Sequence, residues 1–131
     1  MQVLDASVLV EILLQTPLGI RHTDRVLDRN DSLHAPHLLD LETLQAIRRL
    51  TLAGEISAGR AEAALIALLD LELSRHEHTP FIGRIWELRA AMTAYDAAYV
   101  ALAEGLSAVL LTCDGKLARA HGHRAKIELL T

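Results

Sequence analysis

"TAYDAAYVALAEGLSAVLLTCD", residues 93–114, determines the predicted fold because an apolar helical segment is followed directly by an apolar strand. Residues 93–106 carry apolar side chains at helical spacing, and Gly105 is of the type that ends helices. Residues 107–114 form a short apolar run, which is typical of a strand covered on both faces. A helix that feeds a buried strand is the repeating unit of a parallel sheet.

Asp96 is a carboxylate in the segment that otherwise reads as a buried helix. One explanation is a capping box, because Thr93 and Asp96 have the spacing in which each side chain bonds the other's backbone at a helix start. The other explanation is an active site. The two roles are compatible, since a capping acid at a helix amino terminus can also face a ligand. Whether Asp96 belongs to an active site therefore depends on the other acids of the chain.

The remaining segments continue the alternation of strands and helices. Ser7 is the expected amino-terminal cap of the first helix, which Pro17 should end. Strands separated by helices predict an α/β fold, a three-layer α/β/α sandwich around a parallel sheet of about four to five strands. We expect strands at residues 1–5, 32–36, 74–80, 107–114 and 125–130, and helices at residues 7–15, 18–30, 37–54, 57–73, 81–92, 93–106 and 115–122.

Length and composition favour one globular domain over residues 1–131. Apolar residues make up 51% of the chain and aromatic residues 3%, so the core must consist of aliphatic side chains. No apolar run reaches the roughly 18 residues that span a bilayer, and the first residues do not resemble a signal peptide. The single cysteine excludes an internal disulfide. Together these features predict a cytoplasmic protein with no membrane association.

Four acids occupy positions that should lie close together in such a fold. Asp5 and Asp114 end predicted strands, Asp96 opens a helix, and Glu42 lies among leucines in the helix after another strand. Ligands of parallel sheets bind at the carboxyl ends of the strands. Four carboxylates there repel one another unless a hard cation such as Mg²⁺ or Mn²⁺ binds them. Each acid alone also has a structural explanation, as a turn residue, a cap or a solvated helix residue like Asp40.

The chain resembles PIN-domain ribonucleases, and most closely the VapC-type toxins of bacterial toxin–antitoxin pairs. The resemblance covers nearly the whole chain and rests on four segments: "VLDASVLVEILL", "APHLLDLETLQAIRRL", "LRAAMTAYDAAYVALAE" and "LLTCDGKLARA". It implies that Asp5, Glu42, Asp96 and Asp114 are the catalytic acids and hold the metal. In this family the residues that match Ser7 and Thr112 support the acids.

The resemblance further implies Mg²⁺-dependent cleavage of a phosphodiester bond in structured RNA, either transfer or ribosomal RNA. A cognate antitoxin and a second copy of the chain, in a homodimer, are the implied protein partners. Arg89 and Lys116 are the expected RNA contacts. The net charge of −4 does not argue against RNA binding, because without the four site carboxylates the remaining 13 acids equal the 13 lysines and arginines.

Two rival functions are weighed against this one. One is a phosphoacceptor α/β domain of the dehalogenase or receiver type. The dehalogenase type needs a second Asp two residues after the first, where this chain has Ser7, and the receiver type needs adjacent acids, of which "VLDAS" has only one. A catalytically inactive PIN-like interaction module is the stronger alternative, although all four acids are present. Three other features favour structural roles: His76 and His78 have no third metal ligand nearby, Cys113 has no catalytic partner, and Trp86 is expected in the core or in a dimer contact.

Overall fold

Five parallel strands form one sheet in the computed structural model, which describes residues 1–131. The sheet order is β3-β2-β1-β4-β5, and every neighbouring pair is parallel. The strands are β1 (Gln2–Leu4), β2 (Leu33–Pro36), β3 (Ser74–His76), β4 (Val109–Thr112) and β5 (Lys126–Leu129). The prediction of a parallel sheet of four to five strands is therefore confirmed.

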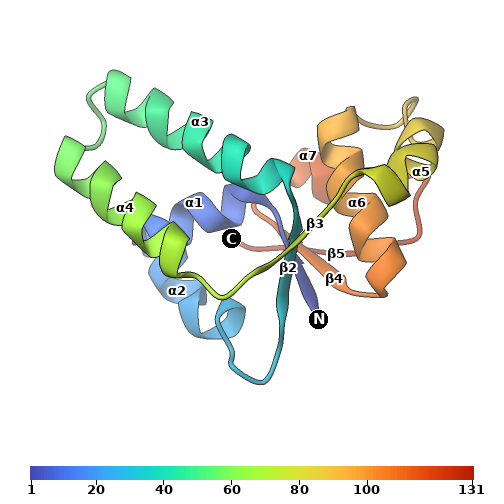
Figure 1. Cartoon of the computed structure of the whole chain (residues 1–131), viewed down its shortest axis with the longest axis horizontal. Coiled ribbons are helices and arrows are strands. Elements are labelled where there is room, and N and C mark those ends of the chain that lie inside the picture. Colours follow the sequence, from blue (N-terminus) through green and yellow to red (C-terminus); the bar gives the residue numbers. More distant parts are fainter.

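Helices lie on both sides of this sheet, as Figure 1 shows, so the three-layer prediction is also confirmed. Helices α1 to α4 lie on one side, α5 and α6 cover the other, and the short α7 packs against β4 and β5. The helices are α1 (Ala6–Leu13), α2 (Pro17–Val26), α3 (Leu38–Leu52), α4 (Ala58–Asp70), α5 (Ile82–Glu87), α6 (Ala94–Leu106) and α7 (Gly115–Ala118), with a 3₁₀ turn η1 at Thr79–Phe81. None of them has the length and apolar composition needed to cross a membrane.

The boundary between β1 and β4 is the topological switch point of the sheet. The chain leaves β1 towards β2 through α1 and α2, and it leaves β4 towards β5 through α7. Because these two connections depart in opposite directions, a crevice opens at the carboxyl ends of β1 and β4. Asp5 directly follows β1, and Asp114 lies two residues after the end of β4.

Helix α6 is the most deeply buried helix and explains why residues 93–106 are so apolar. Residues 97–103 are all buried, and Tyr99 and Leu102 are completely inaccessible to solvent. The helix packs against β1, β2 and β4, in the way expected of a helix that is apolar on nearly every side. Its first turn remains more exposed, and Tyr95 is 62% exposed.

One local prediction about a helix end was wrong, because Ser7 is not the amino-terminal cap of the first helix. Asp5 occupies the cap position of the first helix without a capping bond from its side chain. Ser7 lies inside the first turn, where its hydroxyl donates to the Asp5 carboxylate. Pro17 does not only end that helix but begins α2, where its missing N–H costs nothing. Helix α6 ends at Leu106, as the expected range of residues 93–106 has it, and Ser107 takes the left-handed conformation after it. Gly105 is required for packing, since a Cβ there would lie 2.7 Å from the Phe81 ring.

Candidate active site

The four acids singled out in the sequence line one cavity of about 530 Å³ at the carboxyl end of the sheet. Asp5 reaches it from the end of β1, Glu42 from α3, Asp96 from the first turn of α6 and Asp114 from the start of α7. The structure thus brings together acids that are as many as 109 positions apart in the sequence. Asp40, assigned to solvent from the sequence, instead forms an ion pair with Arg75 outside this cavity.

Asp5 is the most buried of the four acids, with only 7% of its surface exposed. Its Oδ2 atom accepts hydrogen bonds from the Ser7 and Thr112 hydroxyls, each at 2.7 Å. Burial raises the pKa of Asp5, and the nearby Asp114 raises it further, while the two hydroxyls lower it. The hydroxyls therefore stabilise the ionised form of a carboxylate that burial disfavours.

Ser7 and Thr112 also join the ends of β1 and β4. The Cys113 amide donates to the Ser7 Oγ at 2.9 Å, and the Asp114 amide donates to the Thr112 Oγ1 at 3.0 Å. The two hydroxyl oxygens are 3.3 Å apart. Each hydroxyl thus links Asp5 to the backbone that carries Asp114, so the two carboxylates have a fixed relative position.

Tyr99 is a site residue that the sequence analysis missed. It is fully buried in α6, and its hydroxyl donates to the Glu42 Oε1 atom of α3 at 2.6 Å. Partial burial raises the pKa of Glu42, the Tyr99 hydrogen bond lowers it, and Asp5 and Asp96 raise it. A signal was present in the sequence: Tyr99 follows Asp96 by three residues, which places both on the same side of a helix.

Only one of the two hydrogen bonds of a capping box forms between Thr93 and Asp96. Its backbone amide donates to the Thr93 hydroxyl at 3.1 Å, so Thr93 caps α6 as the sequence predicted. The Asp96 carboxylate makes no hydrogen bond and faces the cavity. Burial, Asp5 and Asp114 raise its pKa, whereas Lys116 lowers it. Capping therefore accounts for Thr93 but not for the Asp96 side chain.

Asp114 caps α7, because its Oδ1 atom accepts a hydrogen bond from the Lys116 amide at 2.9 Å. The Lys116 side chain and Arg89 lie outside the acidic cavity. They line a neighbouring cavity of about 370 Å³ that shares Asp96 with it. The two expected RNA contacts are therefore adjacent to the acids but separate from them.

The residues of the acidic cavity fit a hard divalent cation by their chemistry. Carboxylate oxygens are the ligands that Mg²⁺ and Mn²⁺ prefer, and three of these four carboxyls have raised pKa values partly because acids face one another. No three His, Cys, Asp or Glu side chains lie close enough to hold one ion directly. Mg²⁺ often uses only one or two carboxylates and keeps several waters, so direct contact with all four is not required.

Two further residues of the cavity bear on its chemistry. Cys113 lines it, but burial together with Glu11 and Asp5 raises the pKa of the thiol to about 11. A thiol with that pKa remains protonated at neutral pH and is a poor nucleophile, which fits a structural role for Cys113. Arg49 is the one cation among the lining residues, and it could face an anionic ligand.

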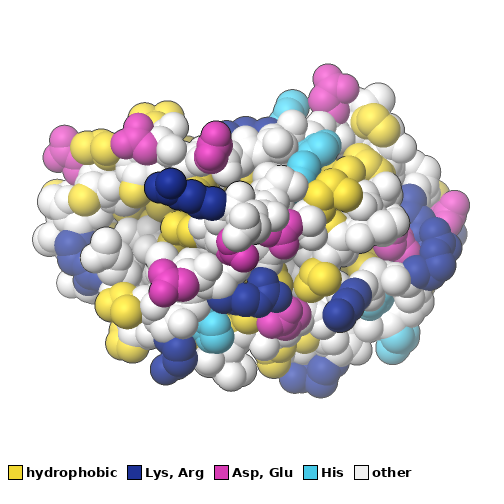
Figure 2. Space-filling model, turned by 90° about the horizontal axis from the view of Figure 1, so that it is seen from below, with side chains coloured by type: hydrophobic (Ala, Val, Ile, Leu, Met, Phe, Trp, Pro, Cys, Tyr) yellow, Lys and Arg dark blue, Asp and Glu magenta, His cyan; other side chains and the backbone are white.

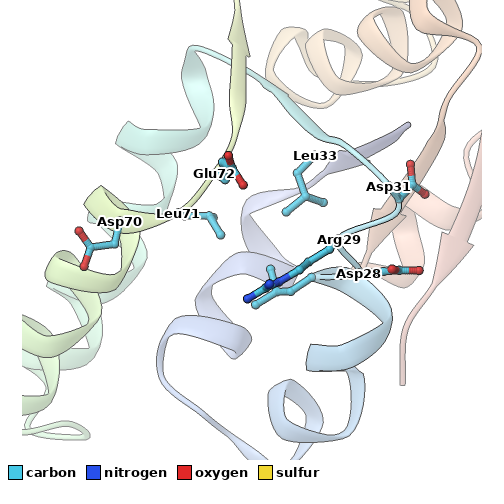
Figure 3. A pocket seen from close by; sticks show the side chains of 8 residues that line it. Asp28, Arg29, Asp31, Leu33, Asp70, Leu71 and Glu72 are labelled. Atoms are coloured by element: carbon cyan, nitrogen blue, oxygen red, sulfur yellow. The ribbon is translucent and has the colours of Figure 1, made fainter.

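A second group of acids lies at the opposite end of the sheet, around a cavity of about 410 Å³. Figure 3 shows that the carboxylates of Asp28, Asp31 and Asp70 do not converge there, and that Arg29 lies between them. Asp31 pairs with the amino terminus of the chain. In Figure 2, which views the molecule from this side, acidic and basic side chains are interspersed without a patch of one sign. This end therefore lacks the converging acids of the first cavity.

A protein-family model, a relative of known name and two solved structures are all similar to this chain. The PIN domain family model matches residues 3–122. Ribonuclease VapC12 of Mycobacterium tuberculosis is 44% identical over 130 residues, which cover 99% of each chain. Among solved structures, PAE2754 from Pyrobaculum aerophilum has a TM-score of 0.72 at 23% identity, covering 96% of this chain and 87% of that one. The Rickettsia felis VapBC2 complex, bound to a DNA fragment from its promoter, has a TM-score of 0.70 at 15% identity and covers 99% and 98% of the two chains.

Proposed function

Because this chain belongs to the PIN-domain family, we propose that it is a metal-dependent ribonuclease and the toxin of a toxin–antitoxin pair. Residues 1–131 would form its one catalytic domain and act in the cytoplasm. Its full-length similarity to a protein named Ribonuclease VapC12 supports the activity. The observation that carries the proposal is the meeting of Asp5, Glu42, Asp96 and Asp114 in one open cavity at the switch point of the sheet.

The chemistry of this cavity suits hydrolysis of a phosphodiester bond. A bound Mg²⁺ or Mn²⁺ ion would offset the negative charge of the phosphate and favour ionisation of a water. Asp5, fixed by two hydroxyls, and Asp114, fixed at the start of α7, would hold that ion. Glu42 and Asp96, which face the same cavity with raised pKa values, would help to hold the ion, directly or through its waters, and would accept the proton of the attacking water.

The proposed substrate is structured RNA, with transfer and ribosomal RNA as the candidate classes. Arg49 inside the acidic cavity, and Arg89 and Lys116 beside it, supply the positive charge that a phosphate backbone requires. The rest of the surface is nearly balanced in charge, so recognition would depend on the shape of an RNA loop rather than on a broad basic face.

The proposed protein partners are an antitoxin and a second copy of this chain. Exposed leucines on α3 and α4 support an apolar contact surface, because Leu41, Leu52 and Leu69 are 69%, 71% and 84% exposed. The solved neighbour from Rickettsia felis is itself a VapBC complex, which supports an antitoxin partner for this chain. Binding of that partner over the acidic cavity would block access of RNA.

Cleavage of total bacterial RNA, with Mg²⁺ or Mn²⁺ and with EDTA, tests the proposal. The wild-type chain should cut RNA only with metal, and Asp96→Asn should reduce the rate by at least about 100-fold, as loss of a group that acts on the attacking water does. Asp70→Asn is the matched control, because Asp70 lies in the cavity at the opposite end. Cleavage by Asp96→Asn at the wild-type rate, or equal cleavage in EDTA, would overturn the proposal.

A further inference from the structure

The cavity beside the acidic site contains two cations, of which Lys116 lies near enough to Asp96 to lower the pKa of that carboxyl. Arg89 and Lys116 line it, together with Thr93, Met92, Asp96, Leu117 and three alanines. Neither cation forms an ion pair, whereas Arg25, Arg75 and Arg84 each pair with a carboxylate. Unpaired cations on two different elements, facing one cavity, favour an anionic ligand. Since the cavity shares Asp96 with the acidic site, a ligand bound there is continuous with the ligand of that site.

Trp86 provides an aromatic surface next to this cavity. It is the only tryptophan of the chain, and it is 65% exposed, which contradicts a position in the core but not the dimer contact that was the other expectation. The Arg89 guanidinium lies 4.7 Å from the centre of the Trp86 ring, and its Nη1 donates to the Trp86 carbonyl at 2.9 Å. These two contacts fix the cation and the ring relative to each other, and most of the ring stays open to solvent.

We infer that this cavity and Trp86 form a subsite for one unpaired nucleotide of the RNA, adjacent to the cleaved bond. This inference rests on the proposed ribonuclease function. Lys116 and Arg89 bind the phosphate of that nucleotide, and its base stacks on the indole of Trp86. An exposed indole is a platform for any base that is free of a partner strand, because every base has a π-face. The enzyme therefore cuts in loops or at strand ends, where a base can be splayed out.

The single tryptophan makes stacking directly measurable. In EDTA, where no cleavage is expected, the wild-type chain is titrated with octa-adenylate and octa-uridylate, and the fluorescence of Trp86 is recorded. Both oligoribonucleotides should quench it in a saturable manner. An eight-residue abasic ribose-phosphate chain is the control, since it retains the phosphates and lacks the bases. It should bind without comparable quenching.

Variants separate the base contact from the phosphate contact. Trp86→Ala should weaken binding of fluorescein-labelled octa-adenylate by about 5- to 150-fold, the range for loss of one stacked base, while Trp86→Phe should retain much of the affinity. Lys116→Ala should lower the slope of log affinity against log salt by about 0.7, as expected for one lost phosphate contact with a single strand. Ile20→Ala and Arg21→Ala are matched controls, because both residues are exposed and lie outside the two cavities.

The outcomes distinguish the subsite from the ribonuclease function itself. If the wild-type chain cuts RNA with metal, but RNA leaves Trp86 fluorescence unchanged and Trp86→Ala binds normally, the subsite is wrong and the ribonuclease proposal stands. If the wild-type chain cuts no RNA but RNA still quenches Trp86, the ribonuclease proposal fails instead. If Trp86→Ala loses affinity for the purified antitoxin or for a second copy of the chain, and none for RNA, Trp86 is a protein contact and the subsite is overturned.

Discussion

Tyr99 and Glu42 show how one buried hydroxyl can orient a site carboxylate. Glu42 accepts the hydrogen bond of the Tyr99 hydroxyl, which joins α6 to α3. Tyr99→Phe removes this bond and leaves the ring packing intact. We expect a roughly 10- to 100-fold lower kcat, comparable to losses on removing residues that orient metal ligands. The melting temperature should fall by only a few degrees, since a net hydrogen bond contributes about 1 kcal/mol.

Tyr95→Phe is the matched control for this prediction. Tyr95 belongs to the same helix, is 62% exposed and makes no hydrogen bond through its hydroxyl. Steady-state cleavage of a labelled RNA and thermal melting of both variants provide the comparison. Equal kcat values for the two variants would mean that the Tyr99 hydroxyl serves packing only.

Thr93 separates helix capping from the chemistry attributed to Asp96. Thr93→Ala removes the oxygen that accepts a hydrogen bond from the Asp96 amide. Loss of such a cap lowers the free energy of unfolding by about 1 kcal/mol. For 131 residues this lowers the melting temperature by about 4 °C. RNA cleavage below that temperature should stay within about threefold of wild type, which is under 1 kcal/mol of activation free energy, because the carboxylate remains in place. Thr93→Ser should restore the stability, and a loss of activity as large as that of Asp96→Asn would contradict the separation.

The role of a single residue could be predicted from the sequence only where its partner lies a few positions away in the chain. Thr93, Asp96 and Ser57 could be placed at helix starts because capping depends on a partner three positions away. The bond from Tyr99 to Glu42 spans 57 positions, and no local pattern contains it. Ser7 was placed as a cap because its type fits that role, whereas its hydroxyl is used by Asp5, a contact that depends on how β1 meets β4.

Between elements, an ion pair connects α5, α6 and the segment before β5. The Glu104 side chain of α6 is only 6% exposed, and Arg84 of α5 donates to both of its oxygens at 2.8 and 3.0 Å. The Arg124 amide also donates to Glu104. The hydrogen bonds from Arg84 are the main reason that the pKa of Glu104 lies below its ordinary value.

This lowered pKa gives a pH-dependent stability with a defined sign. A carboxyl with a lower pKa in the folded state stabilises the fold above its unfolded pKa, about 4.3 for Glu, and loses that contribution as the pH falls. Glu104→Gln should therefore melt several degrees below wild type at pH 7, for a loss of about 1–2 kcal/mol. The difference should shrink below about pH 4. Glu62→Gln, at an exposed position of α4, is the control, and a gap independent of pH would contradict the role of this charge.

Element types followed from the sequence better than element boundaries did. All five strands lie within predicted ranges. Short apolar runs between helices account for the inner strands, whereas β3 is polar and lies at the exposed edge of the sheet. Helix α2 was expected to reach residue 30 but ends at Val26. The Asp28 side chain accepts the Asn30 amide two residues later, a local bond that competes with helix continuation.

At the scale of the whole molecule, the site depends on the order of the strands. The acids meet because β1 and β4 are neighbours, although about 105 residues separate them. Hydrophobic periodicity predicts the strands but not which of them pair. The four acids could nevertheless be grouped from the sequence, because the carboxyl ends of all strands of a parallel sheet lie at the same edge. The resemblance to PIN-domain ribonucleases implied the same four acids.

The last prediction concerns metal and global stability. Four carboxylates at one end of the sheet destabilise the metal-free fold through repulsion and burial. A cation bound only by the folded state stabilises it by about 2.7 kcal/mol at a hundredfold excess over Kd. With an unfolding entropy of about 2.1 cal/mol/K per residue, this corresponds to a shift of about 10 °C for 131 residues. Mn²⁺ or Mg²⁺ should therefore raise the melting temperature of the wild-type chain by about that amount.

The double variant Glu42→Gln with Asp96→Asn should differ from the wild-type chain both in EDTA and in its response to metal. Both replacements remove charge and keep the recorded hydrogen bonds, because Gln still accepts from Tyr99 and the Asp96 amide still reaches Thr93. The variant should melt above wild type in EDTA, since repulsion is relieved, and should gain little from metal. The control pair Asp70→Asn with Glu72→Gln removes equal charge from the opposite cavity and should keep the full metal shift. Scanning fluorimetry of the three proteins, with and without metal, measures these differences. A double variant that is less stable in EDTA and still gains about 10 °C would show that Glu42 and Asp96 do not share a metal site.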